Sequence, residues 1–143
     1  MVIRDTTHPI APLSIDRNMA GQEMPILRSS SGLAYIAFAP AEERTTLLSL
    51  LARSSDPDDA LARDPAQASR LIAATRRRGY GLLWPHTGAV ALPIRVGKRV
   101  LGCINTVWMA RVLDYKEGVD RCLGPLREAQ AVIEEQLTRQ KTV

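Results

Sequence analysis

The stretch TGAVALPIRVGKRVLGCINTVWM, residues 87–109, decides the fold of this chain. Two apolar runs flank the pair Gly97-Lys98, which is typical of the tight turn of a β-hairpin. Because side chains alternate along a strand, every second residue of the later run shares one face. That face carries Leu101, Cys103, Asn105, Val107 and Met109. We therefore expect two adjacent antiparallel strands, the second with one mixed face.

Asn105 is the polar exception within this apolar strand. An amide that is buried without hydrogen-bond partners costs on the order of a few kcal/mol. If the strand is buried, a polar group should therefore meet Asn105. That group can belong to the protein, to a water molecule or to a ligand, and the choice among them is a question of function.

The composition indicates one compact globular domain. The chain has 143 residues, of which 45% are hydrophobic and 24% charged. The formal net charge of +4 is too small and too dispersed to indicate nucleic-acid binding by itself. One basic run, Arg76-Arg77-Arg78, closes a predicted helix, where the helix dipole favours cations. We interpret it as a solvated helix end.

The two cysteines, Cys103 and Cys122, lack the CxxC spacing of a disulfide framework or a zinc site. We therefore expect two buried or half-buried free thiols, no metal and no cofactor. No apolar run is long enough to cross a bilayer, and the first residues lack the apolar core of a signal peptide. These features predict a cytoplasmic protein without a membrane partner.

The first half of the chain predicts mainly helices. Residues 2–6 have strand character from the first residue onward, which suggests a piece cut from a longer protein, and a second short strand is expected at 13–15. The run Ser29-Ser30-Ser31 can cap a helix that lasts until Pro40. A second helix is expected after Pro40, followed by a loop at 54–60.

The second half predicts the sheet and a long closing helix. Asp64-Pro65 is a typical helix start, and Gly79 is a typical end. A short strand at 80–84 precedes the hairpin. A C-terminal helix opens at Asp114, and Gly124-Pro125 predicts a kink or a short break in it. This order of elements favours an α+β fold, an antiparallel sheet flanked by helices.

Read together, these segments resemble the effector-binding domain of IclR-type bacterial transcription regulators. The resemblance rests on MPILRSSSGLAYIAF (24–38), RRGYG (77–81), AVALPI (89–94), the strand at 97–107 and LREA (126–129). It implies a GAF-like curved sheet with helices on both sides and a ligand cavity on one face. Within the family, IRDTTH (3–8) and residues 100–108 look most similar to activators of aromatic-acid catabolism, such as phenylpropionate regulators.

The chain departs from the family pattern at its start. The winged helix-turn-helix DNA reader is missing, as are the first helix and strand of the effector domain. We therefore interpret residues 1–143 as a single effector domain that is truncated at its N-terminus. DNA binding would belong to the parent protein, and an exposed sheet edge would favour dimers or larger homo-oligomers.

The serine run has two interpretations. The free N–H groups at the start of a helix, together with the serine hydroxyls, can hold a ligand carboxylate. Alternatively, one serine caps the helix and the others are solvated. The resemblance implies that Ser29, Ser30 and Ser31 lie on the effector pocket.

The other candidate residues also have two interpretations each. Asn105 suits a carboxylate or a ring hydroxyl but could be satisfied by neighbouring backbone. Cys103 fits a small core residue better than a nucleophile. Trp84 and His86, in the loop before the hairpin, could contact an aromatic acid or simply cover the core edge. The predicted ligand-binding set is Met24, Ser29, Ser30, Ser31, Trp84, His86, Ala89, Cys103, Asn105 and Val107.

The leading functional hypothesis is an effector-sensing and dimerisation module that binds a small organic acid, and not an enzyme. A purely structural dimerisation domain would need no ligand and no cavity. A small hydrolase would need Cys103 or a serine as nucleophile, with His86 at hydrogen-bond distance as its base.

Overall fold

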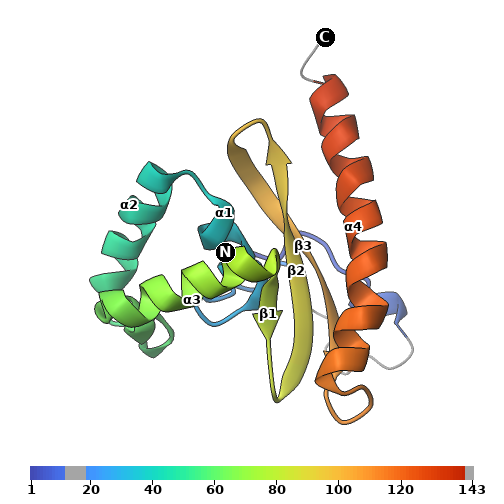
Figure 1. Cartoon of the computed structure of the whole chain (residues 1–143), viewed down its shortest axis with the longest axis horizontal. Helices are drawn as coiled ribbons and strands as arrows, with labels where there is room; N and C mark the ends of the chain where they lie inside the picture. Colours follow the sequence, from blue (N-terminus) through green and yellow to red (C-terminus); the bar gives the residue numbers. More distant parts are fainter. Residues whose placement is uncertain (12–18, 141–143) are drawn as a thin grey trace.

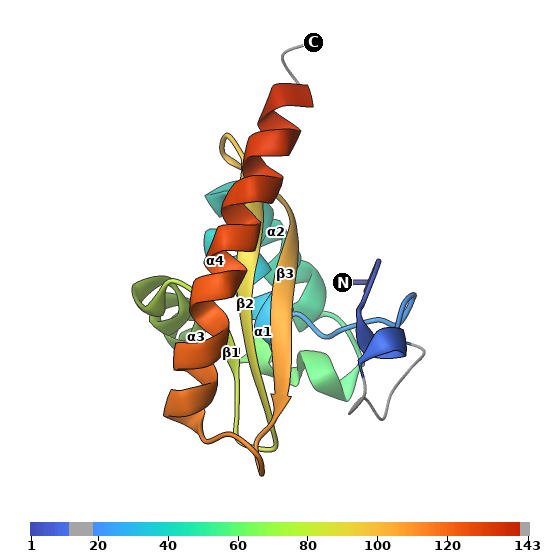
Figure 2. The same ribbon diagram turned by 90° about the vertical axis from the view of Figure 1, so that its right-hand side faces the viewer.

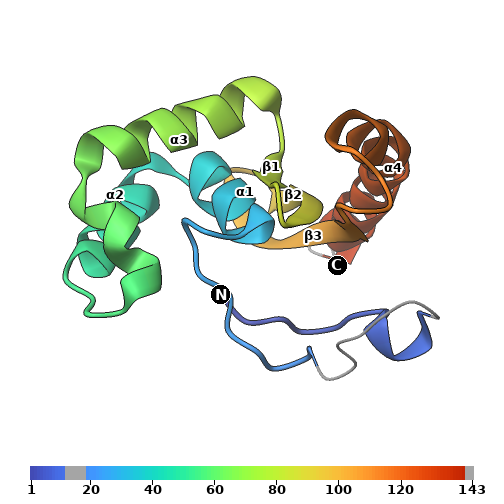
Figure 3. The same ribbon diagram turned by 90° about the horizontal axis from the view of Figure 1, so that it is seen from below.

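The computed structural model describes residues 1–11 and 19–140. Its centre is an antiparallel sheet with strand order β1-β2-β3, and helices cover both faces (Figures 1 and 3). The elements in chain order are η1 (His8–Ile10), α1 (Ser30–Phe38), α2 (Ala41–Ala52), η2 (Pro57–Arg63), α3 (Pro65–Arg78), β1 (Gly81–Leu83), β2 (Thr87–Val96), β3 (Arg99–Met109) and α4 (Tyr115–Gln140). The predicted α+β class is confirmed.

The predicted hairpin is present as β2 and β3. Its turn lies at Gly97-Lys98, where Gly97 has a φ of +62°, a conformation that suits glycine. The register runs from Thr87 opposite Met109 to Val96 opposite Arg99. It shifts between Ile94 and Arg95, so Leu101 has no partner on β2. The hairpin therefore carries a bulge near its turn.

One face of the sheet packs against α4, which runs along β2 and β3 in Figure 2. The buried residues of this core are Tyr80, Val90, Leu92, Trp108 and Leu126. The Trp108 ring is held between two glycines: a Cβ built on Gly88 would lie 2.0 Å from the ring, and one on Gly118 would lie 2.2 Å from it. Only glycine fits at these two contacts.

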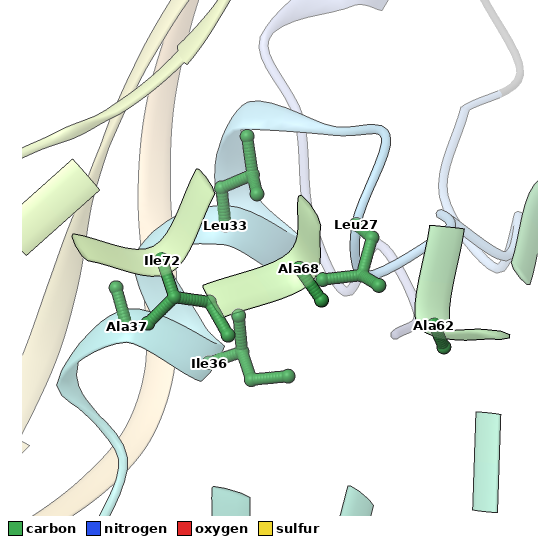
Figure 4. Packing of buried hydrophobic residues seen from close by; sticks show 7 residues of the cluster. All are labelled: Leu27, Leu33, Ile36, Ala37, Ala62, Ala68 and Ile72. Atoms are coloured by element: carbon green, nitrogen blue, oxygen red, sulfur yellow. The ribbon is translucent and has the colours of Figure 1, made fainter. Parts of the chain in front are cut away.

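The other face of the sheet packs against α1, and α2 and α3 form a further layer beyond it (Figure 3). A second core lies between these three helices and η2. Figure 4 shows its buried residues, which are Leu27, Leu33, Ile36, Ala37, Ala62, Ala68 and Ile72. The sheet thus takes part in two layers of packing, one on each face.

The helix boundaries follow the predicted caps. The side chain of Ser29 accepts a hydrogen bond from the N–H of Gly32 and so caps α1. Asp64 caps α3 in the same way by accepting from the N–H of Gln67 at 3.0 Å. Gly79 ends α3 in the left-handed conformation, with a φ of +85°.

Two expectations were wrong. Residues 2–6 form no strand, because Val2 makes only an isolated bridge with Glu23. Part of the loop expected at 54–60 belongs to the 3-10 helix η2, which Asp56 caps. Of the kink or short break expected at Gly124-Pro125, the break is absent, since α4 continues through Pro125. The strand expected at 13–15 lies outside the described residues.

None of the helices in the described part of the chain is long and apolar enough to span a membrane.

Candidate functional site

At the start of α1, the Ser29 side chain has a structural role. The Ser29 hydroxyl accepts from the N–H of Gly32 at 3.0 Å and donates to the carbonyl of Pro25 at 2.7 Å. Only 2% of this residue is exposed. Of the two interpretations of the serine run, helix capping therefore applies to Ser29. Its hydroxyl hydrogen is its only side-chain donor and is already hydrogen-bonded to Pro25.

The next two serines leave backbone donors at the same helix end. Within residues 1–11 and 19–140, the N–H groups of Ser30 and Ser31 have no hydrogen-bond acceptor. Such N–H groups, at the positive end of the helix dipole, attract anions. Ser30 itself is 3% exposed, whereas Ser31 is half-buried. Ser31 is thus the more accessible of the two.

Cys103 connects this helix end to β3. Its thiol donates to the carbonyl of Ser31 at 3.2 Å. Burial raises the pKa of the Cys103 thiol to about 12. The thiol therefore stays protonated at neutral pH, which argues against a nucleophile and agrees with the interpretation of Cys103 as a core residue.

The face of β3 beyond Cys103 is open. Asn105 lies opposite Ala91 and is exposed, so of the three partners considered for its amide (protein, water or ligand) water is available. Val107 follows on the same face with 44% of its surface exposed, while Ala89, opposite it on β2, is buried.

Tyr35 is a neighbour of this site that the sequence did not reveal. It lies one helical turn after Ser31, and its hydroxyl donates to a carboxylate oxygen of Glu43 on α2. This hydrogen bond, with burial and the Glu43 charge, raises the pKa of Tyr35 to about 12. Cys103 and Arg99 also act electrostatically on the phenol. The four-residue spacing from Ser31 was the available signal.

The remaining candidates lie apart from the serines. Trp84 packs edge-to-face on Tyr115 of α4, with ring centroids 5.9 Å apart. His86 is exposed in the loop between β1 and β2, beside Thr87, which pairs with Met109. Met24 is half-buried, and its N–H donates to the carbonyl of Met1 at 2.6 Å.

The structure therefore joins Ser31 to Cys103 directly and places Asn105 and Val107 beyond them on the same strand face. Trp84 is directed to the start of α4 instead. In the described part of the chain, no group of three or more His, Cys, Asp or Glu side chains could hold a metal ion.

No family model matches the sequence. Solved structures do resemble the fold. A candidate transcriptional regulator from a Rhodococcus strain is 19% identical, with a TM-score of 0.67 over 90% of this chain and 53% of that chain. The IclR protein of Thermotoga maritima is 20% identical, with a TM-score of 0.67 over 83% of this chain and 49% of that chain.

An IclR-type transcriptional regulator from Alicyclobacillus acidocaldarius is 22% identical, with a TM-score of 0.62 over 82% of this chain and 48% of that chain. The Rhodococcus and Alicyclobacillus proteins are described as transcriptional regulators. The chain spans about half the length of the structures it matches. At these identities the likeness shows a shared fold: the chain folds as part of an IclR-type regulator does.

Proposed function

We propose that the chain is the effector-sensing and oligomerisation domain of an IclR-type transcription regulator, and that it binds a small aromatic carboxylic acid. One observation supports this proposal: the N–H groups of Ser30 and Ser31, which have no acceptor in the described part of the chain, adjoin a strand face that is exposed at Asn105 and Val107. A helix start and an amide are the groups that recognise a carboxylate and a hydroxyl.

The proposed ligand lies along β3. Its carboxylate would accept from the N–H groups of Ser30 and Ser31, where the helix dipole favours negative charge. Asn105 lies two residues beyond Cys103, a distance of about 6.6 Å along a strand. A substituted ring of that length would reach the Asn105 amide with a hydroxyl and lie against Val107 with its apolar face.

The rest of the regulator would bind DNA. We propose that residues 1–143 form one effector domain and that a winged helix-turn-helix reader belongs to the parent protein, which would act in the cytoplasm. The half-length match to the solved regulators supports this division. The ligand would act by binding one arrangement of the oligomer more tightly than another, since only differential affinity shifts an equilibrium.

The unpaired edge of the sheet supports the oligomer. In the described part of the chain no strand pairs with the outer edge of β3. An open edge of eleven residues offers backbone groups to a second chain. We therefore propose that homo-oligomers form through this side of the molecule.

Thermal unfolding with a panel of acids tests the ligand. We expect at least one of benzoate, cinnamate, phenylpropionate, hydroxyphenylpropionate or a short oxo-acid to raise the melting temperature, because a ligand that binds only the folded state stabilises it. Asn105→Ala should reduce the shift caused by the best acid. Ser69→Ala, an exposed change on α3, is the matched control and should leave the shift unchanged.

Two outcomes would contradict the proposal. If no acid raises the melting temperature while the oligomer persists, the chain is a structural dimerisation domain. If the best acid stabilises the Asn105→Ala variant as much as the original chain, the ligand binds elsewhere.

A further inference from the structure

The helical layer on the far side of α1 from the sheet contains a hollow. It is a groove of about 520 Å³ between α2 and α3. Its apolar walls are formed by Leu48, Ala52, Ala62, Ala68, Ile72 and Ala73. The volume lies in the range of small-molecule sites in proteins, about 300–1,000 Å³. Because the walls hold small and aliphatic side chains without an aromatic ring, the groove suits a slender aliphatic chain.

Two arginines line the same groove, one from each helix. Arg44 of α2 donates from Nη1 to the carbonyl of Ala39 at 3.1 Å, and Arg76 of α3 donates from Nε to the carbonyl of Ala37 at 2.5 Å. Both carbonyls lie at the C-terminal end of α1. The two guanidinium groups therefore lie near the same helix end. Among the described residues, each uses one of its five N–H donors.

The charges of these arginines are not balanced by a carboxylate. Within residues 1–11 and 19–140, neither Arg44 nor Arg76 forms an ion pair, although four other cationic side chains do. Burial and the charge of Arg76 lower the pKa of Arg44. An anion bound between the two guanidinium groups would relieve this repulsion and take up their spare donors.

We propose that the groove between α2 and α3 binds an amphipathic carboxylate, with the aliphatic chain along the apolar walls and the carboxylate between Arg44 and Arg76. The positive charges of the two arginines would attract the carboxylate, and the aliphatic walls would bind the tail. This site is distinct from the face of β3 and does not depend on the function proposed for that face.

Octanoate is the probe for this site, and calorimetric titration of the whole chain is the measurement. We expect octanoate to bind and to perturb the backbone amides of α2 and α3 in NMR spectra, whereas octylammonium, with the same tail and the opposite charge, should not bind. Arg44→Gln and Arg76→Gln should each weaken octanoate binding about tenfold, because each removes a charged hydrogen-bond donor.

Two further variants test whether octanoate occupies the groove itself. Ala73→Leu keeps both arginines but fills part of the groove, so it should also weaken binding. Arg77→Gln removes an exposed charge of α3 that does not line the groove, so it should leave binding unchanged. The proposal is overturned if octanoate fails to bind, if octylammonium binds equally well, or if the two groove-arginine variants bind octanoate like the original chain.

Discussion

At the scale of single residues, Cys103 links the two elements of the candidate site. Its thiol reaches across 72 positions of sequence to the carbonyl of Ser31. Burial makes this thiol a hydrogen-bond donor rather than a reactive group, because it raises the pKa of Cys103 to about 12. The same burial gives the folded state a pH dependence that can be measured.

We expect the free energy of unfolding to fall as the pH rises from about 9 toward 12. In this interval the Cys103 thiol ionises in the unfolded chain, whose thiol pKa is about 9, but stays protonated in the folded chain. The contribution is complete below pH 9 and is lost as the pH approaches the folded value. Urea unfolding at about pH 8 and about pH 10.5 should show a smaller loss for Cys103→Ala than for the original chain. Equal losses would contradict the assignment.

Gly88 tests the packing of the Trp108 ring. A Cβ at Gly88 would lie 2.0 Å from that ring, so Gly88→Ala should lower the free energy of unfolding by about 1–3 kcal/mol, the usual cost of overpacking. Gly102→Ala is the matched control in the same hairpin, since nothing lies within 4 Å of its Cβ position. Chemical denaturation of both variants should separate them clearly. A Gly88 variant as stable as the Gly102 variant would contradict this packing.

At the scale of elements, the Ser29 cap of α1 contributes to the stability of the fold and does not depend on a ligand. Ser29→Ala should cost about 1 kcal/mol of stability, because the N–H of Gly32 and the carbonyl of Pro25 both lose their partner. Ser69→Ala, an exposed position inside α3, should change stability by less than about 0.5 kcal/mol. Thermal and urea unfolding would reveal the difference, and two equal variants would argue against the cap.

Elements with local signals could be predicted from the sequence. Asp64 starts α3 through a hydrogen bond with a residue three positions on, and Gly79 ends it through its own positive φ. Gly97 likewise forms the hairpin turn through its own positive φ. Elements that depend on distant partners could not. The segment at 2–6 has strand character, but it lacks a neighbouring strand in the described structure. Helix α4 tolerates Pro125 within a long helix that packs on the sheet.

The candidate site, like the fold, could be predicted from the sequence only where local signals exist. The serine run indicated a helix start, and its cap is present at Ser29. The alternation of β3 correctly placed Cys103 and Asn105 on one face. The exposure of Asn105 could not be predicted, because it depends on which distant parts of the chain pack over this strand face. Tyr35 was missed because its partner, Glu43, belongs to the next helix.

At the scale of the whole molecule, α4 and α1 cover the two faces of the sheet (Figure 3), while no strand of the described structure pairs with the outer edge of β3. Two large apolar residues of this strand are exposed, Leu101 at 46% and Val107 at 44%. An open edge with exposed apolar side chains favours pairing between chains.

We therefore expect the chain to self-associate, with a mass that rises with concentration in light scattering. Val107→Lys should shift the population toward monomers, because a charge on an edge strand opposes pairing. Val112→Lys is the control, since Val112 is 62% exposed but lies after the end of β3. If both lysine variants associate like the original chain, oligomers do not form through this strand.

The packing of Trp108 between Gly88 and Gly118 has one more consequence. The indole lies between a glycine of β2 and a glycine of α4 and is 8% exposed, whereas the other tryptophan, Trp84, is 37% exposed. The fluorescence of Trp108 should therefore be blue-shifted and shielded from a dissolved quencher for as long as α4 stays docked. The fluorescence of Trp108 therefore reports whether α4 is docked on the sheet.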